Sequence, residues 1–365
     1  MALRRGFQDH FDWPLFVTTA AISVVGVINL YSATSVGVLR DIYIQQIYWL
    51  TLGAGAAVLV AAVDYRHFER YGWVAYGLGI TLLVLVFLLA REVRGSQRWI
   101  PIGSFSLQPS ELMKLFLIIA LAKHLHNDPR TEGRTLKDLI IPGLILVFPL
   151  GLILAQPDLG TALILVFVFC TIMFLTHLKM RSLMTLVITM AVSAPLAWNY
   201  LLKDYQRARV TSFMDPENDL LGSGWHAYQA KVAIGSGGLT GKGYLQGTQN
   251  QHKFLPDQHS DFPFPVWAEE HGFIGSVVLI MLYMVLVLWG IKIASEAKDR
   301  FGAVVAVGVS AMIFWHAVIN LGMVCGLLPV VGITLPLFSY GGSSVLTIMA
   351  GIGLLMNVSM RRFHF

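Results

Sequence analysis

Charged residues stand beside long apolar runs in three places, and these are the first candidates for chemistry. Glu111 and Lys114 open one apolar run, Asp158 lies in the turn Gln-Pro-Asp-Leu-Gly-Thr, and Asp261 directly precedes another run. Ionisable groups at the edge of a membrane are costly to desolvate, so they are functional candidates by default. A carboxylate in such a place can act as a general base or hold a cation.

Each of these residues also has a purely structural interpretation, which we favour for any one of them taken alone. Asp261 fits a helix N-cap, and Glu111 and Lys114, three residues apart, fit an ion pair. Asp158, two residues before a glycine, fits a turn or a cap. The functional hypothesis rests on all of them meeting at one face of the molecule.

The composition indicates which elements position these residues. Apolar residues make up 56% of the 365, charged residues only 13%, and the mean hydropathy is +0.66. Soluble proteins carry about 25% charged residues, so this chain has too little polar surface for water. We expect an all-α polytopic membrane protein with about ten transmembrane helices, as a single domain over residues 1–365. The expected spans are 14–33, 42–63, 72–90, 111–126, 139–155, 160–178, 183–202, 264–290, 303–324 and 343–360.

The distribution of Lys and Arg predicts the orientation. With the N-terminus in the cytoplasm, the short cytoplasmic loops hold most of these residues, and an even number of spans returns the C-terminus to that side. The first apolar run reaches spanning length, so we expect a retained helix and not a cleaved signal peptide. Asp158, Asp261, Glu111, Glu269 and Glu270 then all face outward. The short outer loops hold Arg40, Arg91, Arg94 and Arg98.

One outer segment, 203–263 between the seventh and eighth spans, is far longer than a connector. Its scattered aromatic and aliphatic residues argue against disorder. Within it, apolar residues at i, i+3 and i+7 over 225–232 predict a short amphipathic helix at the membrane surface. The glycine-rich run 234–243 lacks the Walker pattern. It is either a hinge, which we favour, or a turn that brings Lys242 near a lipid-linked phosphate.

A second irregular stretch is predicted near the C-terminus. Residues 328–344 contain two prolines and three glycines among apolar residues, so they cannot form a continuous helix. Such backbone survives at membrane depth only when it is buried in protein or lines a cavity. We expect it to form a re-entrant wall of an outward-facing cavity that includes Ser343. Asn320 either satisfies part of this backbone or faces the cavity.

Together these motifs resemble the SEDS family of shape, elongation, division and sporulation proteins, and the match runs from Tyr31 to Met360. Within the family the chain is similar to the RodA-like branch more than to the FtsW branch. One departure is the run Phe262-Pro263-Phe264-Pro265, where the family usually has Phe-Ile-Phe and a small residue. The motifs that carry the resemblance are Gly95-Ser-Gln-Arg-Trp99, Gln108-Pro-Ser-Glu111, Gln156-Pro-Asp-Leu-Gly-Thr161, Ser260-Asp261-Phe262, Ala268-Glu-Glu-His-Gly272 and Pro336-Leu-Phe-Ser-Tyr-Gly-Gly-Ser-Ser344.

The resemblance implies a peptidoglycan glycosyltransferase of the bacterial cytoplasmic membrane that polymerises lipid II for cell elongation and rod shape. The family's essential aspartate falls on Asp261, which we expect to act as general base. The implied partners are lipid II with its undecaprenyl chain, a class B penicillin-binding protein and other membrane proteins of the elongation complex, with no nucleic acid. Supporting site residues are expected at Glu111, Lys114, Asp158, Arg98, Arg207, Arg209, Lys242, Ser343 and Asn320.

No cofactor is required by the sequence. Positive charge for the departing pyrophosphate can come from arginine and lysine, and a divalent cation, Mg²⁺ or Mn²⁺, is the alternative. Asp261, Asp158 and Glu111 are the candidate ligands, although no fixed spacing marks them as such. Two other classes of function stay open: a flippase for the lipid-linked precursor, which needs charge near the midplane, and a non-catalytic scaffold for a transpeptidase, which has no need of Asp261.

Overall fold

The computed structural model describes residues 11–35, 41–90, 98–103, 105–128, 133–176, 178–179, 181–182, 184–185, 188, 192, 204–214, 223–251 and 257–362. Helices dominate this part of the chain. The helices are α2 (Trp13–Ala33), α3 (Ile42–Ala62), α4 (Tyr65–Arg70), α5 (Gly72–Leu89), α6 (Pro109–His126), η1 (Leu136–Leu139), α7 (Ile140–Ala155), α8 (Leu159–Leu175), α10 (Asp204–Met214), α11 (Ser223–Ser236), α12 (Thr248–Gln251), α13 (Pro263–Ser295), α14 (Arg300–Val324) and α15 (Gly342–Arg361).

Nine of the ten expected spans coincide with helices, and the tenth, 183–202, falls mostly outside the described residues. Seven helices among the described residues are long and apolar enough to cross a membrane: α2, α3, α5, η1 continued by α7, α13, α14 and α15. The apolar helix α8 is shorter. The chain is therefore an all-α polytopic membrane protein, as its composition predicts.

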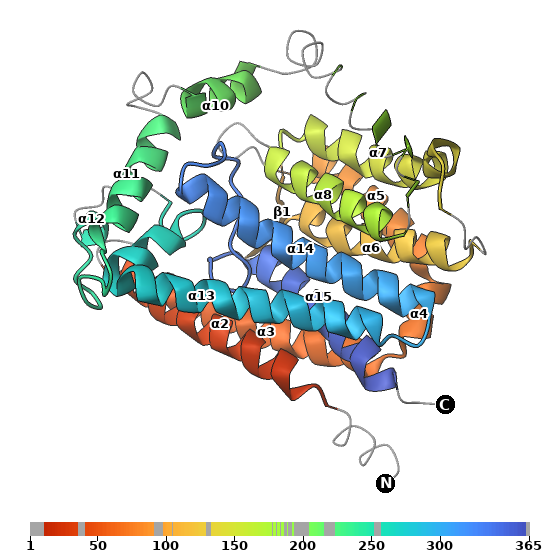
Figure 1. Ribbon diagram of the computed structural model, residues 1–365, viewed down its shortest axis with the longest axis horizontal. Helices are drawn as coiled ribbons and strands as arrows, with labels where there is room; N and C mark the ends of the chain where they lie inside the picture. The colour runs from red at the N-terminus through yellow and green to blue at the C-terminus, as the bar shows by residue number, and fades with distance from the viewer. Residues whose placement is uncertain are drawn as a thin grey trace.

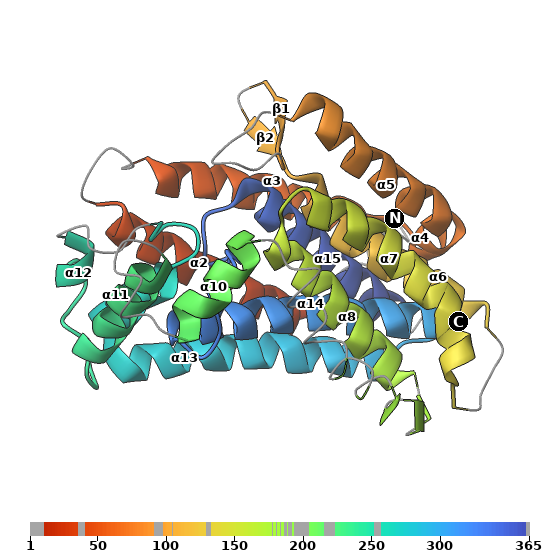
Figure 2. The same cartoon turned by 90° about the horizontal axis from the view of Figure 1, so that it is seen from above.

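Helix α6 carries three charged residues yet lies in the interior of the bundle. It packs against α5, α14, α7, α8 and α15, and most of its side chains are buried. Around this helix, α15 packs on α3, and α13 packs on both α14 and α2. Figures 1 and 2 show α11 and α12 at one end of the bundle and α4 at the other.

Helix α13 is broken, although the sequence indicates one continuous span. Its 33 residues exceed the roughly 20 that cross a bilayer. Gly272 interrupts it with φ 63° and ψ −160°, so a short first helix precedes the long second one. Pro263 and Pro265 lie at the start of the first piece, where proline fits a helix. The family departure at these positions therefore leaves the helix start in place.

Two local elements differ in how far the sequence predicts them. A helix, α11, is present over the predicted 225–232, but the side chains it buries are Ala230 and Ala233, whereas Tyr228 of the expected apolar face is exposed. The segment 91–110 contains an antiparallel hairpin of β1 (Ile100–Ile102) and β2 (Phe105–Leu107) that the sequence did not indicate. Ile100 pairs with Leu107 in this hairpin.

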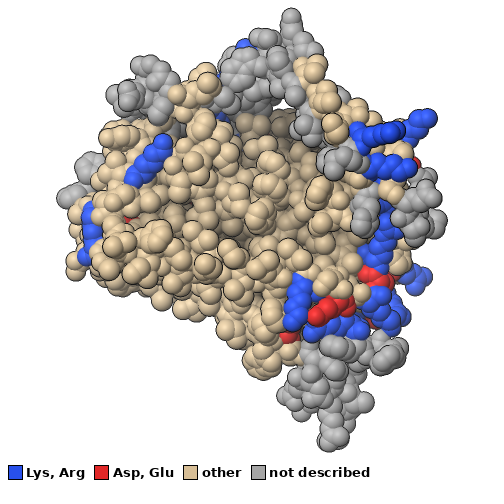
Figure 3. Space-filling view, in the orientation of Figure 1, with Lys and Arg blue, Asp and Glu red and all other residues tan. Residues whose placement is uncertain are grey.

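Lys and Arg gather toward one end of the molecule. Figure 3 shows them around the end where α4 lies, beside a broad face without charge. The residues at this end include Arg66 and Arg70 of α4, Lys123 of α6, Arg361 as the last residue of α15, and Arg362 directly after it. The uncharged face is what a membrane-embedded bundle requires.

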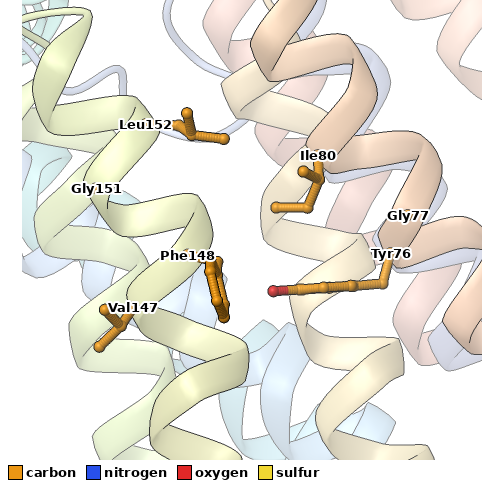
Figure 4. Close-up of a pocket in the computed structure, with 7 residues that line it drawn as sticks. All are labelled: Tyr76, Gly77, Ile80, Val147, Phe148, Gly151 and Leu152. Atoms are coloured by element: carbon orange, nitrogen blue, oxygen red, sulfur yellow. The ribbon is translucent and has the colours of Figure 1, made fainter.

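Two apolar cavities open between the helices. One, of about 550 Å³, lies between α5 and α7, where Tyr76, Ile80 and Phe148 point toward one another (Figure 4). The second, of about 620 Å³, is lined by α2, α3 and α15 together with Phe11. Neither cavity includes Asp261 or any of the other predicted site residues.

Candidate active site

The irregular segment, residues 325–341, connects α14 to α15 and forms the centre of the site. It is not helical, as its prolines and glycines predict, and most of its apolar side chains are buried. Four polar side chains from three helices, α3, α13 and α14, satisfy its carbonyl groups, as buried backbone requires. The hydrogen bonds run from Asn320 to the carbonyl of Ile333, from His316 to that of Thr334, from Tyr283 to that of Pro336 and from Gln46 to that of Ser339.

Asp261 is half-buried and lies against this segment at the N-terminal end of α13. A Cβ placed on Gly332 would lie 3.4 Å from Oδ2 of Asp261, so the carboxylate lies directly beside the backbone there. The Asp261 N–H donates to the carbonyl of Asp257 (3.1 Å), and the Asp261 carbonyl accepts from the Asn320 amide (3.0 Å). The backbone of Asp261 is therefore fixed from both sides.

The turn that leads to Asp261 is held by two other parts of the chain. The side-chain amide of Gln258 donates to the carbonyl of Ala33 at the end of α2 (2.6 Å). The N–H of Tyr340, in the irregular segment, donates to the carbonyl of His259 (2.8 Å). These contacts join positions more than eighty residues apart, so no local sequence pattern predicts them.

Asp158 is buried and accepts hydrogen bonds on both oxygens. It caps α8 by accepting from the Thr161 N–H (3.3 Å), as predicted for a cap. Its other oxygen accepts from Gln108 (2.9 Å) and Ser110 (3.1 Å), at the start of α6. Nη1 of Arg98 lies 3.7 Å from Oδ1 of Asp158. Asp158 thus joins the N-terminal ends of α6 and α8.

Arg98 and Ser343 surround the same junction. The guanidinium of Arg98 also donates to the carbonyl oxygens of Gln156 (3.2 Å) and Pro157, which orients it over the turn. The hydroxyl of Ser343, in the first turn of α15, accepts from the Gln108 N–H (3.0 Å). Both residues therefore lie within the polar cluster predicted from the sequence.

Glu111 and Lys114 form a buried ion pair with a third partner. Lys114 is 1% exposed and Glu111 7%, and their Nζ and Oε2 atoms are 2.7 Å apart. Nζ also lies 2.8 Å from Nε2 of His316, which is 2% exposed. Nδ1 of His316 in turn lies 3.2 Å from the carbonyl oxygen of Thr334. A polar chain thus runs from α6 through α14 to the irregular segment.

The irregular segment brings these groups together. A Cβ on Gly160, two residues after Asp158, would lie 3.0 Å from the carbonyl oxygen of Val331 and 3.2 Å from that of Gly332. Gly332 therefore packs against the turn of Asp158 on one side and against the Asp261 carboxylate on the other. The convergence of Asp158, Asp261 and the Glu111–Lys114 pair on one region is thus present in the structure.

Glu269 and Glu270 lie in a separate cluster with Lys242. Glu269 is fully buried, and its carboxylate is 2.6 Å from Nζ of Lys242 and 3.0 Å from the hydroxyl of Thr248. Glu270 accepts from the hydroxyl of Ser32 in α2. These two carboxylates are not solvated charges, because Glu269 binds Lys242 and Thr248 of the preceding segment and Glu270 binds α2.

The glycine-rich run is explained by the break in α13. The N–H groups of Lys242 and Gly243 donate to the carbonyls of Glu269 and Glu270 (3.0 Å each), which the break leaves without helical partners. A Cβ on Gly241 would lie 2.1 Å from the Glu270 carbonyl oxygen, and one on Gly272 would lie 2.3 Å from the Gly241 nitrogen. The glycines permit this close approach of two backbones.

Arg207 and Arg209 lie on α10, which packs on α11. Helix α11 in turn reaches the site, because the His226 ring lies 6.0 Å from that of Phe262, next to Asp261. Helix α11 therefore lies between the helix that carries the two arginines and the turn of Asp261.

Sequence reasoning missed His316 and underrated Gln108. His316 stands inside an apolar run of α14, four residues before Asn320. An ionisable group inside a span, one helical turn from a flagged polar residue, was the signal that would have found it. Gln108 was noted only as part of a motif, although its side-chain amide donates to the carboxylate of Asp158 (2.9 Å) and to the hydroxyl of Ser110 (3.1 Å).

A divalent cation held by Asp261, Asp158 and Glu111 does not fit this arrangement. Within the described ranges, no group of three or more His, Cys, Asp or Glu is placed to hold a metal ion. Asp158 already accepts on both oxygens, and Glu111 is bound by the Lys114 ammonium. Two of the three candidate carboxylates are therefore already engaged by other polar groups.

The chain matches proteins of known family over nearly its full length. A family model described as "Cell cycle protein", named for FtsW, RodA and SpoVE, matches residues 12–364. The peptidoglycan glycosyltransferase MrdB of Escherichia coli K12 is 38% identical over 363 residues, or 98% of this chain and 96% of the relative. The peptidoglycan glycosyltransferase RodA of Treponema pallidum is 33% identical, over 98% of this chain and 99% of the relative.

Solved structures give the same result. A chain of a structure described as "Structural coordination of polymerization and crosslinking by a peptidoglycan synthase complex" superimposes with a TM-score of 0.85 at 35% identity, over 97% of this chain and 99% of that one. RodA of Thermus thermophilus superimposes with a TM-score of 0.73 at 32% identity, over 97% and 98%. The chain therefore belongs to the FtsW, RodA and SpoVE family and is RodA-like, as its motifs indicate.

Proposed function

We propose that this protein polymerises lipid II into glycan strands at the outer face of the cytoplasmic membrane during cell elongation, with Asp261 as the general base. The class of activity follows from full-length relatives: the chain is a peptidoglycan glycosyltransferase. The substrate, the place in the cell and the role of Asp261 are our proposal.

The observation that carries the assignment of Asp261 is its setting. Its backbone is fixed by Asp257 and Asn320, while its carboxylate lies half-buried beside Gly332. A fixed backbone with a reachable carboxylate is what a general base requires. The side chains of Asp158 and Glu111 are buried, at 3% and 7% exposure, whereas Asp261 is only half-buried and is therefore the most accessible of the three carboxylates to a substrate. Asp261 is therefore the best placed of the three.

The step is a glycosyl transfer with inversion. The sugar 4-hydroxyl of one lipid II attacks the anomeric carbon of the growing chain, and the new C–O bond forms as the bond to undecaprenyl pyrophosphate breaks. Asp261 takes the hydroxyl proton, and the leaving pyrophosphate departs with the bonding electrons. Removal of a proton by a positioned side chain contributes typically about 10²–10⁴-fold to such a rate.

Arg98 is our candidate for stabilising the departing pyrophosphate. It lies over the turn of Asp158, which packs on the same Gly332 that borders Asp261. A guanidinium presents several donors that match phosphate oxygens. Lys114 is enclosed by its partners and Lys242 pairs with Glu269, so we assign these two lysines to structure. Arg207 and Arg209 on α10 are the next candidates.

The apolar cavity between α2, α3 and α15 is our candidate for the undecaprenyl tail. Its volume is about 620 Å³ and most of its lining residues are apolar, with Thr19, Ser23 and Thr51 as the polar ones. Two of its walls lead to the site: α2 ends at Ala33, which binds Gln258 of the Asp261 turn, and α15 begins beside Ser343. A tail held there would leave the sugars near Asp261.

The topology proposed with this function has ten spans in a single domain, both termini in the cytoplasm, and the 203–263 segment outside. The gathering of Lys and Arg at the end of α4 and α15 supports it, because cytoplasmic loops are enriched in these residues (Figure 3). Asp261 and α11 lie toward the opposite end. A class B penicillin-binding protein is the proposed partner, since a polymerase needs a transpeptidase to crosslink its product.

The test is polymerisation of fluorescently labelled lipid II by the purified protein, alone and with its cognate class B penicillin-binding protein made inactive as a transpeptidase. Glycan strands that lysozyme digests, with one undecaprenyl pyrophosphate released per linkage, are the expected result. Translocation of labelled lipid II across proteoliposomes without any strands would support the flippase instead. Absence of strands with a folded wild-type protein in the complex contradicts the proposal.

A further inference from the structure

We propose that His316 is a positioning residue for the transfer: it ties the Lys114 ammonium to the backbone of the irregular segment and so fixes the wall beside the Asp261 carboxylate. This inference rests on the proposed function, because it concerns how Asp261 is held for its reaction. His316 touches no substrate, and it acts through the residues that it holds.

The contacts of His316 require one tautomer. An ammonium has three donors and no acceptor, so Nε2 of His316, 2.8 Å from Nζ of Lys114, accepts a hydrogen bond. Nδ1 then carries the ring proton and donates it to the carbonyl of Thr334 at 3.2 Å. The ring is thus a neutral bridge with one accepting and one donating end, each already engaged.

His316 acts together with Asn320, one helical turn further along α14. The two side chains bind consecutive carbonyls of the irregular segment, those of Thr334 and Ile333. The Asn320 amide also donates to the carbonyl of Asp261. Gly332, the next residue back along the segment, borders the Asp261 carboxylate. One face of α14 therefore sets the position of both the catalytic turn and its wall.

The other end of the bridge explains why a cation is buried here. Lys114 and Glu111 lie on α6 and are buried among apolar side chains, whose packing requires no charge. An isolated buried ion pair of this kind contributes little to stability. Through His316 the ion pair helps to position the irregular segment, because Lys114 orients the imidazole ring and the ring binds the carbonyl of Thr334. Rigid support of this sort keeps a reacting group within a fraction of an ångström of its place.

Substitution of His316 by asparagine or glutamine tests its two hydrogen bonds, to Lys114 and to Thr334, one at a time. In His316→Asn the amide nitrogen takes the place of Nδ1 and keeps the donor to Thr334, but the acceptor for Lys114 is lost. In His316→Gln the amide oxygen takes the place of Nε2 and keeps the acceptor, but the donor to Thr334 is lost. His316→Leu removes both. The proposal assigns the positioning effect to the Thr334 contact.

The experiment measures kcat and KM for lipid II polymerisation, and the thermal midpoint in detergent, for wild type and these three variants. The matched control is His126→Leu, since His126 lies at the other end of α6 and pairs with Glu69. We expect His316→Leu and His316→Gln to lower kcat by about 10²-fold with KM changed less than about twofold, as a misplacement of about 1 Å does. His316→Asn is expected to recover kcat to within about tenfold of wild type, and His126→Leu to keep it.

Three results overturn the proposal: a kcat for His316→Leu within about twofold of wild type, equal losses in the Asn and Gln variants, or losses that follow the thermal midpoint in every variant including His126→Leu. If the leucine variant does not fold, the comparison of the two amides decides. Because wild-type polymerisation is measured in the same series, failure of the proposed function appears as absent strands in wild type and is distinct from failure of the His316 assignment.

Discussion

Breaking the buried pair between Lys114 and Glu111 is expected to destabilise the protein strongly, whereas removing both charges is not. At an effective dielectric constant of about 20, two charges 2.7 Å apart attract by about 6 kcal/mol. Desolvation offsets much of this attraction in the intact protein, but a single substitution leaves one uncompensated charge and costs about 3–5 kcal/mol. We therefore expect Lys114→Met and Glu111→Leu each to lose about this much.

The double variant Lys114→Met with Glu111→Leu tests whether the stability losses of the two single variants are coupled or simply add. With both charges replaced by apolar side chains, the remaining cost is the lost donor to His316, about 1–3 kcal/mol. The assay is thermal unfolding in detergent followed by tryptophan fluorescence. The single variants should unfold about 4–7 °C below wild type on the entropy scale of soluble domains. Losses that simply add in the double variant would refute the coupling.

Further predictions concern the break in α13, the orientation and Arg98. Gly272→Ala is expected to lose about 2–5 kcal/mol from positive φ and the clash with the glycine-rich turn, while Gly143→Ala, with open space at its Cβ, stays near wild type in the same unfolding assay. With both native cysteines replaced by alanine, a cysteine at Gln249 should react with an impermeant maleimide on whole cells and one at Arg361 should not; the reverse pattern contradicts the topology. Arg98→Ala should lower kcat for polymerisation by about 10–10²-fold, and an unchanged kcat removes its role at the pyrophosphate.

The elements of the fold were predictable because the hydrocarbon core allows few solutions. Apolar runs of spanning length give the helices directly, and nine of the ten appear where expected. The irregular segment was also predictable, since two prolines and three glycines exclude a helix. The break at Gly272 was not, because a glycine within an apolar run is common in transmembrane helices and gives no sign of its φ angle.

The candidate site was predictable as a set of groups but not as a geometry. Asp261, Asp158 and the Glu111–Lys114 pair were marked by their place at helix starts. Their connection through Gly332 depends on packing between segments far apart in sequence, which no local pattern encodes. The same holds for Lys242: its glycine-rich run favoured a hinge, with a phosphate-binding turn as the alternative, and neither interpretation predicts the ion pair with Glu269.

His316 illustrates the reverse case, in which a signal was present and unread. A histidine in an apolar span is often a satisfied core residue, so it attracts no attention alone. Its spacing from Asn320 places both on one face of α14, toward the same irregular segment. Periodicity among the few polar residues of a span therefore carries information that the hydropathy of the span does not.

The most direct measurement is the initial rate of lipid II polymerisation by Asp261→Asn in complex with the partner transpeptidase. Asparagine keeps the shape of the side chain and the backbone contacts to Asp257 and Asn320, so the variant should fold. Asp257→Asn is the matched control, because asparagine tolerates the φ of 46° at that position. We predict a rate about 10²–10⁴-fold below wild type for Asp261→Asn and a near wild-type rate for Asp257→Asn. Polymerisation by folded Asp261→Asn at the wild-type rate would contradict the assignment of Asp261 as the catalytic base.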